Sequence, residues 1–163
     1  MITDISVRSV QDTDYPELMA IENQIWTTEN SPIVHHYDNV ADYQERMGEK
    51  QVFVAVLNGQ VIGFIDVHHP TPLPSHRQQW MLGIGVHPDF QSSGAGGLLL
   101  QHLKTIAPDH GIHKISLRVM GTNTAAIAFY KKNGFIQEGL LKDEFYMNGS
   151  YCDDYLFAYI LND

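Results

Sequence analysis

The residues best suited to chemistry lie in the segment VHPDFQSSGAGGLLLQHL, residues 86–103, where a predicted strand ends and an apolar helix begins. Gly94, Gly96 and Gly97 stand at the start of that helix, although a glycine inside a helix costs about 1 kcal/mol relative to alanine. The first N–H groups of a helix lack acceptors within it, and the helix dipole adds partial positive charge there. Glycines let an anion approach those amides closely. The segment therefore predicts a phosphate-binding turn, with a tight turn packed closely on the sheet as the alternative.

Two common phosphate motifs are excluded by the residues that follow the glycines. A P-loop requires a lysine and then a serine or threonine after its last glycine, whereas Leu98 and Leu99 follow Gly97. A dinucleotide-binding fingerprint requires a third glycine at the position of Leu99. The turn therefore belongs to another class of phosphate site.

A longer pattern surrounds the glycines. It reads V-x-P-x-x-Q-x-x-G-x-G-x-x-L and is made by Val86, Pro88, Gln91, Gly94, Gly96 and Leu99. This pattern resembles the acetyl-CoA-binding motif of the GCN5-related N-acetyltransferases, the GNAT family. A second segment, NTAAIAFYKKNGF at residues 123–135, is similar to the N-x-x-A-x-x-x-Y-x-x-x-G-F segment of that family. The resemblance covers the chain from about Val52 to its end, and residues 1–50 match in pattern only.

The resemblance implies that acetyl-CoA is the cofactor and assigns residues to it. Backbone amides of the turn would hold the pyrophosphate, namely those of Gln91, Ser92, Ser93, Gly94, Ala95, Gly96 and Gly97. Backbone groups of Ile84 and Val86 would face the pantetheine arm, Asn123 would hydrogen-bond to the arm, and Tyr130 would lie near the thioester sulfur. Gly83 and Gly85 fit a strand that bends at this point, although a simple bulge also places glycine in a strand.

Acetyl transfer to an amine requires a neutral amine, a stabilised oxyanion and a protonated leaving thiolate. Tyr130 suits the last role because a phenol with a pKa of about 10 can donate a proton to a thiolate. A core tyrosine with its hydroxyl at the surface is the alternative interpretation of Tyr130. The backbone N–H of Val86 is the expected donor to the oxyanion.

The group that takes the proton of the amine is less evident. Many members of the family carry a glutamate on the motif strand, where this chain has Met81 and Leu82. His68 on the preceding strand is the candidate because its side chain titrates near neutral pH, and His69 would point to the other face of the strand. An ordered water could replace such a base. Other candidates near the first helices are Glu22, Glu29, His35 and His36.

No metal site is expected, and no second nucleophile. His110 and His113 are three residues apart but lie in a turn without an accompanying cysteine, which favours a surface position. Cys152 lies in a predicted strand, where a free cysteine acts as a small hydrophobic residue.

Hydrophobic periodicity predicts the elements that must position these residues. Strands are expected at 4–10, 51–57, 60–68, 78–86, 113–120, 134–141 and 151–161, and helices at 14–26, 39–50, from the glycine turn onward, and at 123–135. Asn58-Gly59 and Asn148-Gly149 predict hairpin turns, and Asp14 and Glu17 have capping-box spacing. The order β-α-α-β-β-β-α-β-α-β-β predicts a single α/β domain over residues 1–163, with a GNAT-like mixed sheet and helices on both faces.

Composition limits the partners. A formal net charge of −9 argues against nucleic acid and favours a cationic substrate. Asp153 and Asp154 either attract such a substrate or are solvated charges at a strand edge. No apolar run reaches membrane-spanning length, so no membrane partner is expected. The single cysteine cannot form an internal disulfide and fits the cytoplasm.

These features together predict a cytoplasmic acetyl-CoA-dependent N-acetyltransferase that moves an acetyl group to a primary amine by direct transfer in a ternary complex. The expected acceptor is a small cationic amine, and a protein N-terminus or lysine is the alternative. A non-catalytic acyl-CoA-binding sensor is the third interpretation, because the motif strand lacks its glutamate. The resemblance also implies a homodimer.

Overall fold

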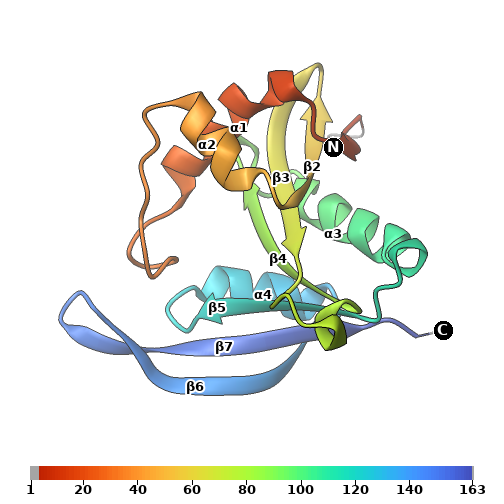
Figure 1. The fold of residues 1–163 in the computed structure, drawn as a ribbon. Helices are drawn as coiled ribbons and strands as arrows, with labels where there is room; N and C mark the ends of the chain where they lie inside the picture. Colours follow the sequence, from red (N-terminus) through yellow and green to blue (C-terminus); the bar gives the residue numbers. More distant parts are fainter. Residues whose placement is uncertain (1–3, 163) are drawn as a thin grey trace. The chain divides into compact units, whose positions relative to one another are not determined.

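The computed structural model describes residues 4–162 of the chain (Figure 1). The chain forms two compact units that alternate along the sequence. The first unit comprises Met1–Ile25, His35–His68 and Leu82–His110, and the second comprises Trp26–Val34, His69–Met81 and Gly111–Asp163. The strand β4 (Gln79–Val86) begins in the second unit and ends in the first.

The first unit contains one side of a sheet and three helices. Its strands are hydrogen-bonded in the order β1-β2-β3-β4, and β2 pairs antiparallel with both β1 and β3. The new elements are β1 (Ser6–Ser9), α1 (Tyr15–Ile25), α2 (Val40–Met47), β2 (Gln51–Leu57), β3 (Gln60–His68) and α3 (Ala95–Ile106). β2 and β3 have the bounds that the sequence predicts, because Asn58 and Gly59 both adopt positive φ, 50° and 79°, and close a tight hairpin.

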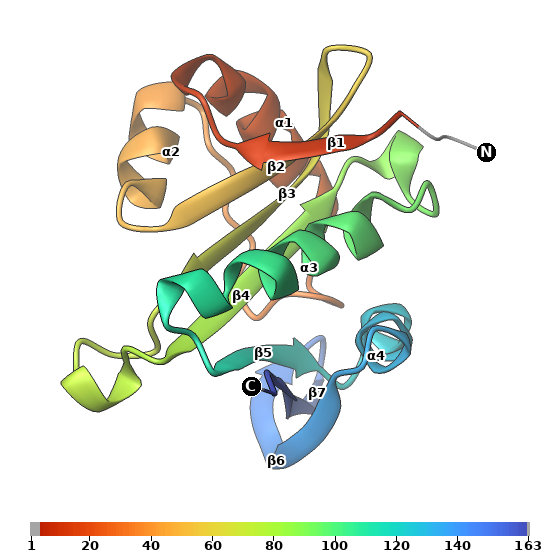
Figure 2. The same cartoon turned by 90° about the vertical axis from the view of Figure 1, so that its right-hand side faces the viewer.

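Helices cover both faces of this part of the sheet. The ring of Phe53 on β2 lies 4.9 Å from the ring of His102 on α3. The flanking residues Val52 and Val54 instead join a buried cluster with α1 and α2, which includes Leu18 and Tyr43. Because successive side chains of a strand point to opposite faces, α1 and α2 cover one face and α3 covers the other (Figure 2). The prediction of helices on both faces is confirmed in this unit.

The start of α1 differs from the sequence prediction. Asp14 does not form a capping box with Glu17; its carboxylate accepts hydrogen bonds from Arg8 Nη1 and Nη2 at 2.7 and 2.9 Å, and from the Gln11 N–H at 2.7 Å. Glu17 accepts a hydrogen bond from the Val61 N–H at 2.9 Å and so joins α1 to β3. Both carboxylates have partners distant in sequence that the local spacing does not reveal.

The second unit contains the other strands and α4. The first residues of β4 pair in parallel with β5, and β7 pairs antiparallel with both β5 and β6, in the order β4-β5-β7-β6 (Figure 1). The new elements are β5 (Lys114–Met120), α4 (Thr124–Lys132), β6 (Ile136–Met147) and β7 (Ser150–Ile160). Parallel and antiparallel pairs occur together, so the prediction of a mixed α/β sheet and the predicted order of elements are confirmed.

Two details of the last hairpin differ from the prediction. The sequence predicts that β6 ends at Leu141, but the strand continues for six more residues, to Met147. The pairing with β7 resumes after a register shift between Leu141 and Phe145, where Asp143 adopts a φ of 52°. Asp154 is not a solvated charge, since it is 3% exposed and pairs with Arg118 Nε at 2.5 Å. The Asn148-Gly149 turn is confirmed, with φ of 54° and 78°.

Candidate functional site

The glycine turn of the first unit has two residues in the left-handed region. Ser92 has a φ of 66°, and Gly94, the N-cap of α3, has a φ of 95°. A Cβ atom at Gly94 would meet no atom within 4 Å. The glycine is therefore required by the backbone conformation and not by crowding, because a side chain is strained at that φ.

The amides of the turn divide into two groups. The Ser93 N–H donates to the Phe90 carbonyl at 3.2 Å, and the Ala95 N–H donates to Ser93 Oγ at 3.2 Å. These two amides are engaged within the protein. Gly96 and Gly97 lie in the first turn of α3, where amides lack an acceptor inside the helix and the helix dipole is positive. These amides at the start of α3 suit an anion, and the phosphate-binding role expected for the turn stays a prediction.

β4 approaches the neighbouring strand closely at its glycines. A Cβ atom at Gly85 would lie 2.4 Å from Ile25 Cδ1 and 2.7 Å from Phe64 Cε1. A Cβ atom at Gly83 would lie 3.1 Å from Oδ2 of Asp66. Side chains of α1 and β3 thus occupy the space that larger residues would need. Ile84 and Val86 flank Gly85 on β4 and are half-buried.

Asp66 is a residue that sequence reasoning missed. It is 5% exposed, and Lys50 Nζ lies 3.6 Å from its Oδ1. Burial raises the pKa of the Asp66 carboxyl, and the nearby Lys50 ammonium offsets part of that rise. The available signal was one acid inside the otherwise apolar run VIGFIDV of β3.

The candidate bases of the first unit occupy different surroundings. His68 ends β3, half-buried, on the face of the strand that Phe64 and Asp66 share. Glu22 Oε1 accepts a hydrogen bond from Tyr43 Oη at 3.5 Å. The remaining two lie near exposed charges, because His35 Nε2 is 3.1 Å from Arg46 Nη2 and His36 Nε2 is 3.4 Å from Asp38 Oδ1. The role expected for His68 stays a prediction.

Tyr130 and Asn123 belong to α4 in the second unit. Tyr130 is 8% exposed, and its ring centroid lies 5.5 Å from that of Phe129 and 5.8 Å from that of Phe135. Burial raises the pKa of the Tyr130 phenol, so it keeps its proton at neutral pH. Asn123 is the N-cap of α4 and its Oδ1 accepts a hydrogen bond from the Ala126 N–H at 3.3 Å.

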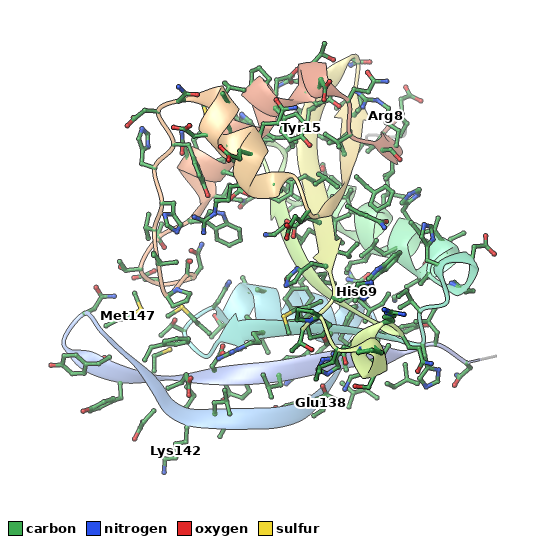
Figure 3. The ribbon with its side chains drawn as sticks, viewed as in Figure 1. Arg8, Tyr15, His69, Glu138, Lys142 and Met147 are labelled. Carbon is green, nitrogen blue, oxygen red and sulfur yellow. The ribbon has the colours of Figure 1, made fainter. Side chains whose placement is uncertain are left out.

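The second unit also contains a pocket with a volume of about 360 Å³. It is lined by the segment after α1, the end of β5 and the β6–β7 hairpin, with Met147 near the hairpin turn (Figure 3). The lining residues are Thr28, Glu29, Met120, Thr122, Met147, Asn148, Ser150 and Cys152.

Hydrogen bonds hold the walls of this pocket together. Thr122 Oγ1 donates to the Glu29 carbonyl at 2.6 Å, and Asn148 Nδ2 donates to Thr28 Oγ1 at 3.1 Å. Cys152 is buried, as expected for a small hydrophobic residue, with its Sγ 3.8 Å from Thr122 Oγ1. Of the candidate bases that the sequence offers, Glu29 alone lines the pocket.

Known acetyltransferases are similar to this chain in sequence. L-amino acid N-acetyltransferase AaaT of Escherichia coli (strain K12) is 28% identical over 163 residues, which cover 96% of this chain and 98% of that protein. An N-alpha-acetyltransferase of Sulfurisphaera tokodaii is also 28% identical, over 93% of this chain and 90% of that protein. N-alpha-acetyltransferase 60 of Xenopus tropicalis is 28% identical over 141 residues, and this chain spans 58% of the length of that protein.

Solved structures share the fold. The structure of smu.2055 from Streptococcus mutans UA159 matches with a TM-score of 0.89 and 25% identity, over 96% of this chain and 99% of that one. The structure of the acetyltransferase yncA from Salmonella typhimurium, solved with acetyl-CoA, matches with a TM-score of 0.85 and 21% identity, over 99% and 96% of the two chains. Among the described residues, no helix is both long and apolar enough to span a membrane.

The family model described as "Acetyltransferase (GNAT) family" matches residues 15–135, which include α1, the glycine turn and α4 with Tyr130. The match covers most of the chain. The chain therefore belongs to the GNAT family of acetyltransferases, as the two sequence motifs predict, and the prediction of an N-acetyltransferase is confirmed at the level of the family.

Proposed function

We propose that the chain is an acetyl-CoA-dependent N-acetyltransferase that transfers acetyl directly to a small cationic amine in a ternary complex. The observation that carries this proposal is the turn before α3, where Gly94 adopts a φ of 95° and opens an apolar helix. The residues fit the donor, since the first-turn amides of Gly96 and Gly97 and the positive end of α3 suit a pyrophosphate. When bound, acetyl-CoA supplies the acetyl group as a thioester.

The family resemblance assigns roles in this proposal to four residues. Backbone groups of Ile84 and Val86 on β4 would face the pantetheine arm, and the Val86 N–H would donate to the carbonyl oxygen of the acetyl group. Because Asn123 Oδ1 already caps α4, its Nδ2 is the atom that would donate to the cofactor. The Tyr130 hydroxyl holds a proton at neutral pH and would donate it toward the departing sulfur.

The pocket of the second unit supports a cationic acceptor. Glu29 is the one charged residue among those that line it, and a carboxylate favours an ammonium group over an anion. Met120 and Met147 offer flexible apolar surface for the rest of the acceptor. A free amino acid would bring its own carboxylate toward Glu29. Repulsion between the two carboxylates disfavours a free amino acid as the acceptor. A peptide N-terminus is the second candidate acceptor, favoured by the identity to N-alpha-acetyltransferases.

The test is release of free thiol from acetyl-CoA in the presence of matched amines. We expect turnover with L-methioninamide and little with L-methionine, because the two differ by one carboxylate. Glu29→Gln should raise KM for the amide several-fold, and Glu49→Gln, which removes an exposed acid outside the pocket, should leave it unchanged. Binding of acetyl-CoA without turnover of any amine would support an acyl-CoA sensor instead.

Two parts of the proposal rest on the family resemblance and on composition alone. The homodimer and the cytoplasmic location stay predictions. Sedimentation of the purified chain tests the first, and fractionation of the source cells tests the second.

A further inference from the structure

The short segment that carries Glu29 is folded on itself. The N–H groups of Asn30 and Ser31 both donate to the Thr27 carbonyl, at 3.2 and 2.9 Å, and the Thr27 N–H donates to Asn30 Oδ1 at 2.7 Å. The Glu29 N–H donates to Thr27 Oγ1 at 3.2 Å. These hydrogen bonds close a turn over residues 27–31, called here the 27–31 turn, whose shape is set by its own residues.

Two side-chain hydrogen bonds attach the 27–31 turn to the strands of the second unit. Thr122 Oγ1, just after β5, donates to the Glu29 carbonyl at 2.6 Å. Asn148 Nδ2, in the turn between β6 and β7, donates to Thr28 Oγ1 at 3.1 Å. The shorter of the two bonds is made to Glu29 itself. With its N–H bonded to Thr27 and its carbonyl bonded to Thr122, Glu29 has both of its backbone polar groups engaged.

The carboxylate of Glu29, in contrast, is available to a ligand. The residue is exposed, and within residues 4–162 no ion pair includes its carboxylate. It is also the one charged residue among those that line the pocket. The attraction between a carboxylate and an ammonium group weakens as their separation grows. The backbone position of Glu29 therefore decides how closely its carboxylate meets an ammonium group in the pocket.

We infer, resting on the proposed function, that Thr122 is a positioning residue that sets the selectivity of the pocket for a cationic acceptor. Its hydroxyl acts through the Glu29 carbonyl and holds Glu29 at the end of β5, where Met120 and Cys152 also line the pocket. The other neighbour of the hydroxyl is Cys152 Sγ at 3.8 Å, and a thiol is a weak hydrogen-bond partner. The Glu29 carbonyl is thus the main partner of this hydroxyl.

The experiment compares the kinetics of the full-length chain with L-methioninamide and with an arylamine that is uncharged at the assay pH. Thr122→Val keeps the size of the side chain and removes the hydroxyl. KM for the amide should rise about fivefold with kcat unchanged, because the lost interaction binds the ground state and the transition state alike. KM for the arylamine should change by less than about twofold, since a neutral amine gains little from a carboxylate. Thr122→Ser retains the hydroxyl and should restore the wild-type KM.

The Glu29→Gln background separates positioning from a general effect on the fold. In that background Thr122→Val should raise KM for the amide no further, because its effect passes through the carboxylate that is already absent. Thr105→Val is the matched control. It removes a threonine hydroxyl that donates to the Gln101 carbonyl at 2.9 Å on α3, and KM for both amines should stay at the wild-type value.

The inference is overturned if folded Thr122→Val keeps KM for the amide within about twofold of the wild type, or if the effects of Glu29→Gln and Thr122→Val simply add. An equal rise of KM for both amines would also overturn it. Should Thr122→Val fail to fold, Thr28→Val decides, since it releases the same turn from Asn148, and unchanged selectivity between the two amines then overturns the inference.

Failure of the proposed function gives different results. A wild type that acetylates no amine, or a Glu29→Gln variant with an unchanged KM for the amide, contradicts the cationic acceptor before Thr122 is tested. A raised KM in Glu29→Gln together with an unchanged KM in Thr122→Val leaves the proposed function standing and removes only the role of Thr122.

Discussion

The side chain of Tyr130 differs from those of its aromatic neighbours Phe129 and Phe135 by one hydroxyl group. Within residues 4–162 no hydrogen-bond partner satisfies that hydroxyl, although the ring is almost fully buried. Because burial also raises the pKa of the phenol, the proton stays on the oxygen throughout the range in which the enzyme would work. The hydroxyl can therefore donate to a bound partner at little cost to the fold.

Tyr130→Phe should lower kcat by about a hundredfold, because the departing sulfur loses its proton donor, while the affinity for acetyl-CoA changes little. Steady-state kinetics and calorimetric titration with acetyl-CoA measure the two quantities. Tyr15→Phe is the control, since Tyr15 is also 8% exposed and lies on α1. Equal kcat values for the two variants would contradict a role for Tyr130 in proton donation.

Among the elements, α3 depends on the conformation of the residue that precedes it. Gly94 and Gly111 both adopt positive φ, 95° and 71°. A Cβ atom added at either glycine would meet no other atom within 4 Å. Alanine at either site is strained to a similar degree, so both variants should lose about 1–2 kcal/mol of unfolding free energy. Only Gly94→Ala should weaken acetyl-CoA binding, by about tenfold or more, because it disturbs the amides of the turn. Denaturant unfolding and calorimetry separate the two effects, and parallel loss of affinity in Gly111→Ala would contradict the assignment of the turn.

The sequence predicts elements well where local chemistry determines them. The Asn58-Gly59 turn fixes the ends of β2 and β3, and Asn123 marks the start of α4 through its side-chain cap. The end of β6 is missed because the irregularity at Asp143 arises from pairing with β7, which local patterns do not encode. Asp66 is missed for a related reason, since its surroundings come from Lys50 and from Gly83 on another strand.

Across the whole molecule, acidic residues outnumber basic ones, 19 to 10, and the net charge is −9. Such a charge raises the local concentration of cations around a protein, and dissolved salt screens the effect over a Debye length of about 10 Å at 0.1 M. We therefore expect KM for L-methioninamide to rise by about threefold between about 0.05 and 0.5 M sodium chloride, with kcat unchanged. An arylamine that is uncharged at the assay pH is the control. A salt-independent KM for the cation would show that the overall charge has no part in attracting the acceptor.

The interleaving of the two units has a consequence for biosynthesis. The first unit ends at His110, so its strands and α-helices are synthesised before β5, α4, β6 and β7. Translation proceeds at about 5–20 residues per second, which is slow compared with hairpin formation. The nascent chain can thus pair β2 with β3, and bury the apolar cluster between these strands and α1 and α2, while the last third of the mRNA is still being translated. The long β6–β7 hairpin is the last element to emerge.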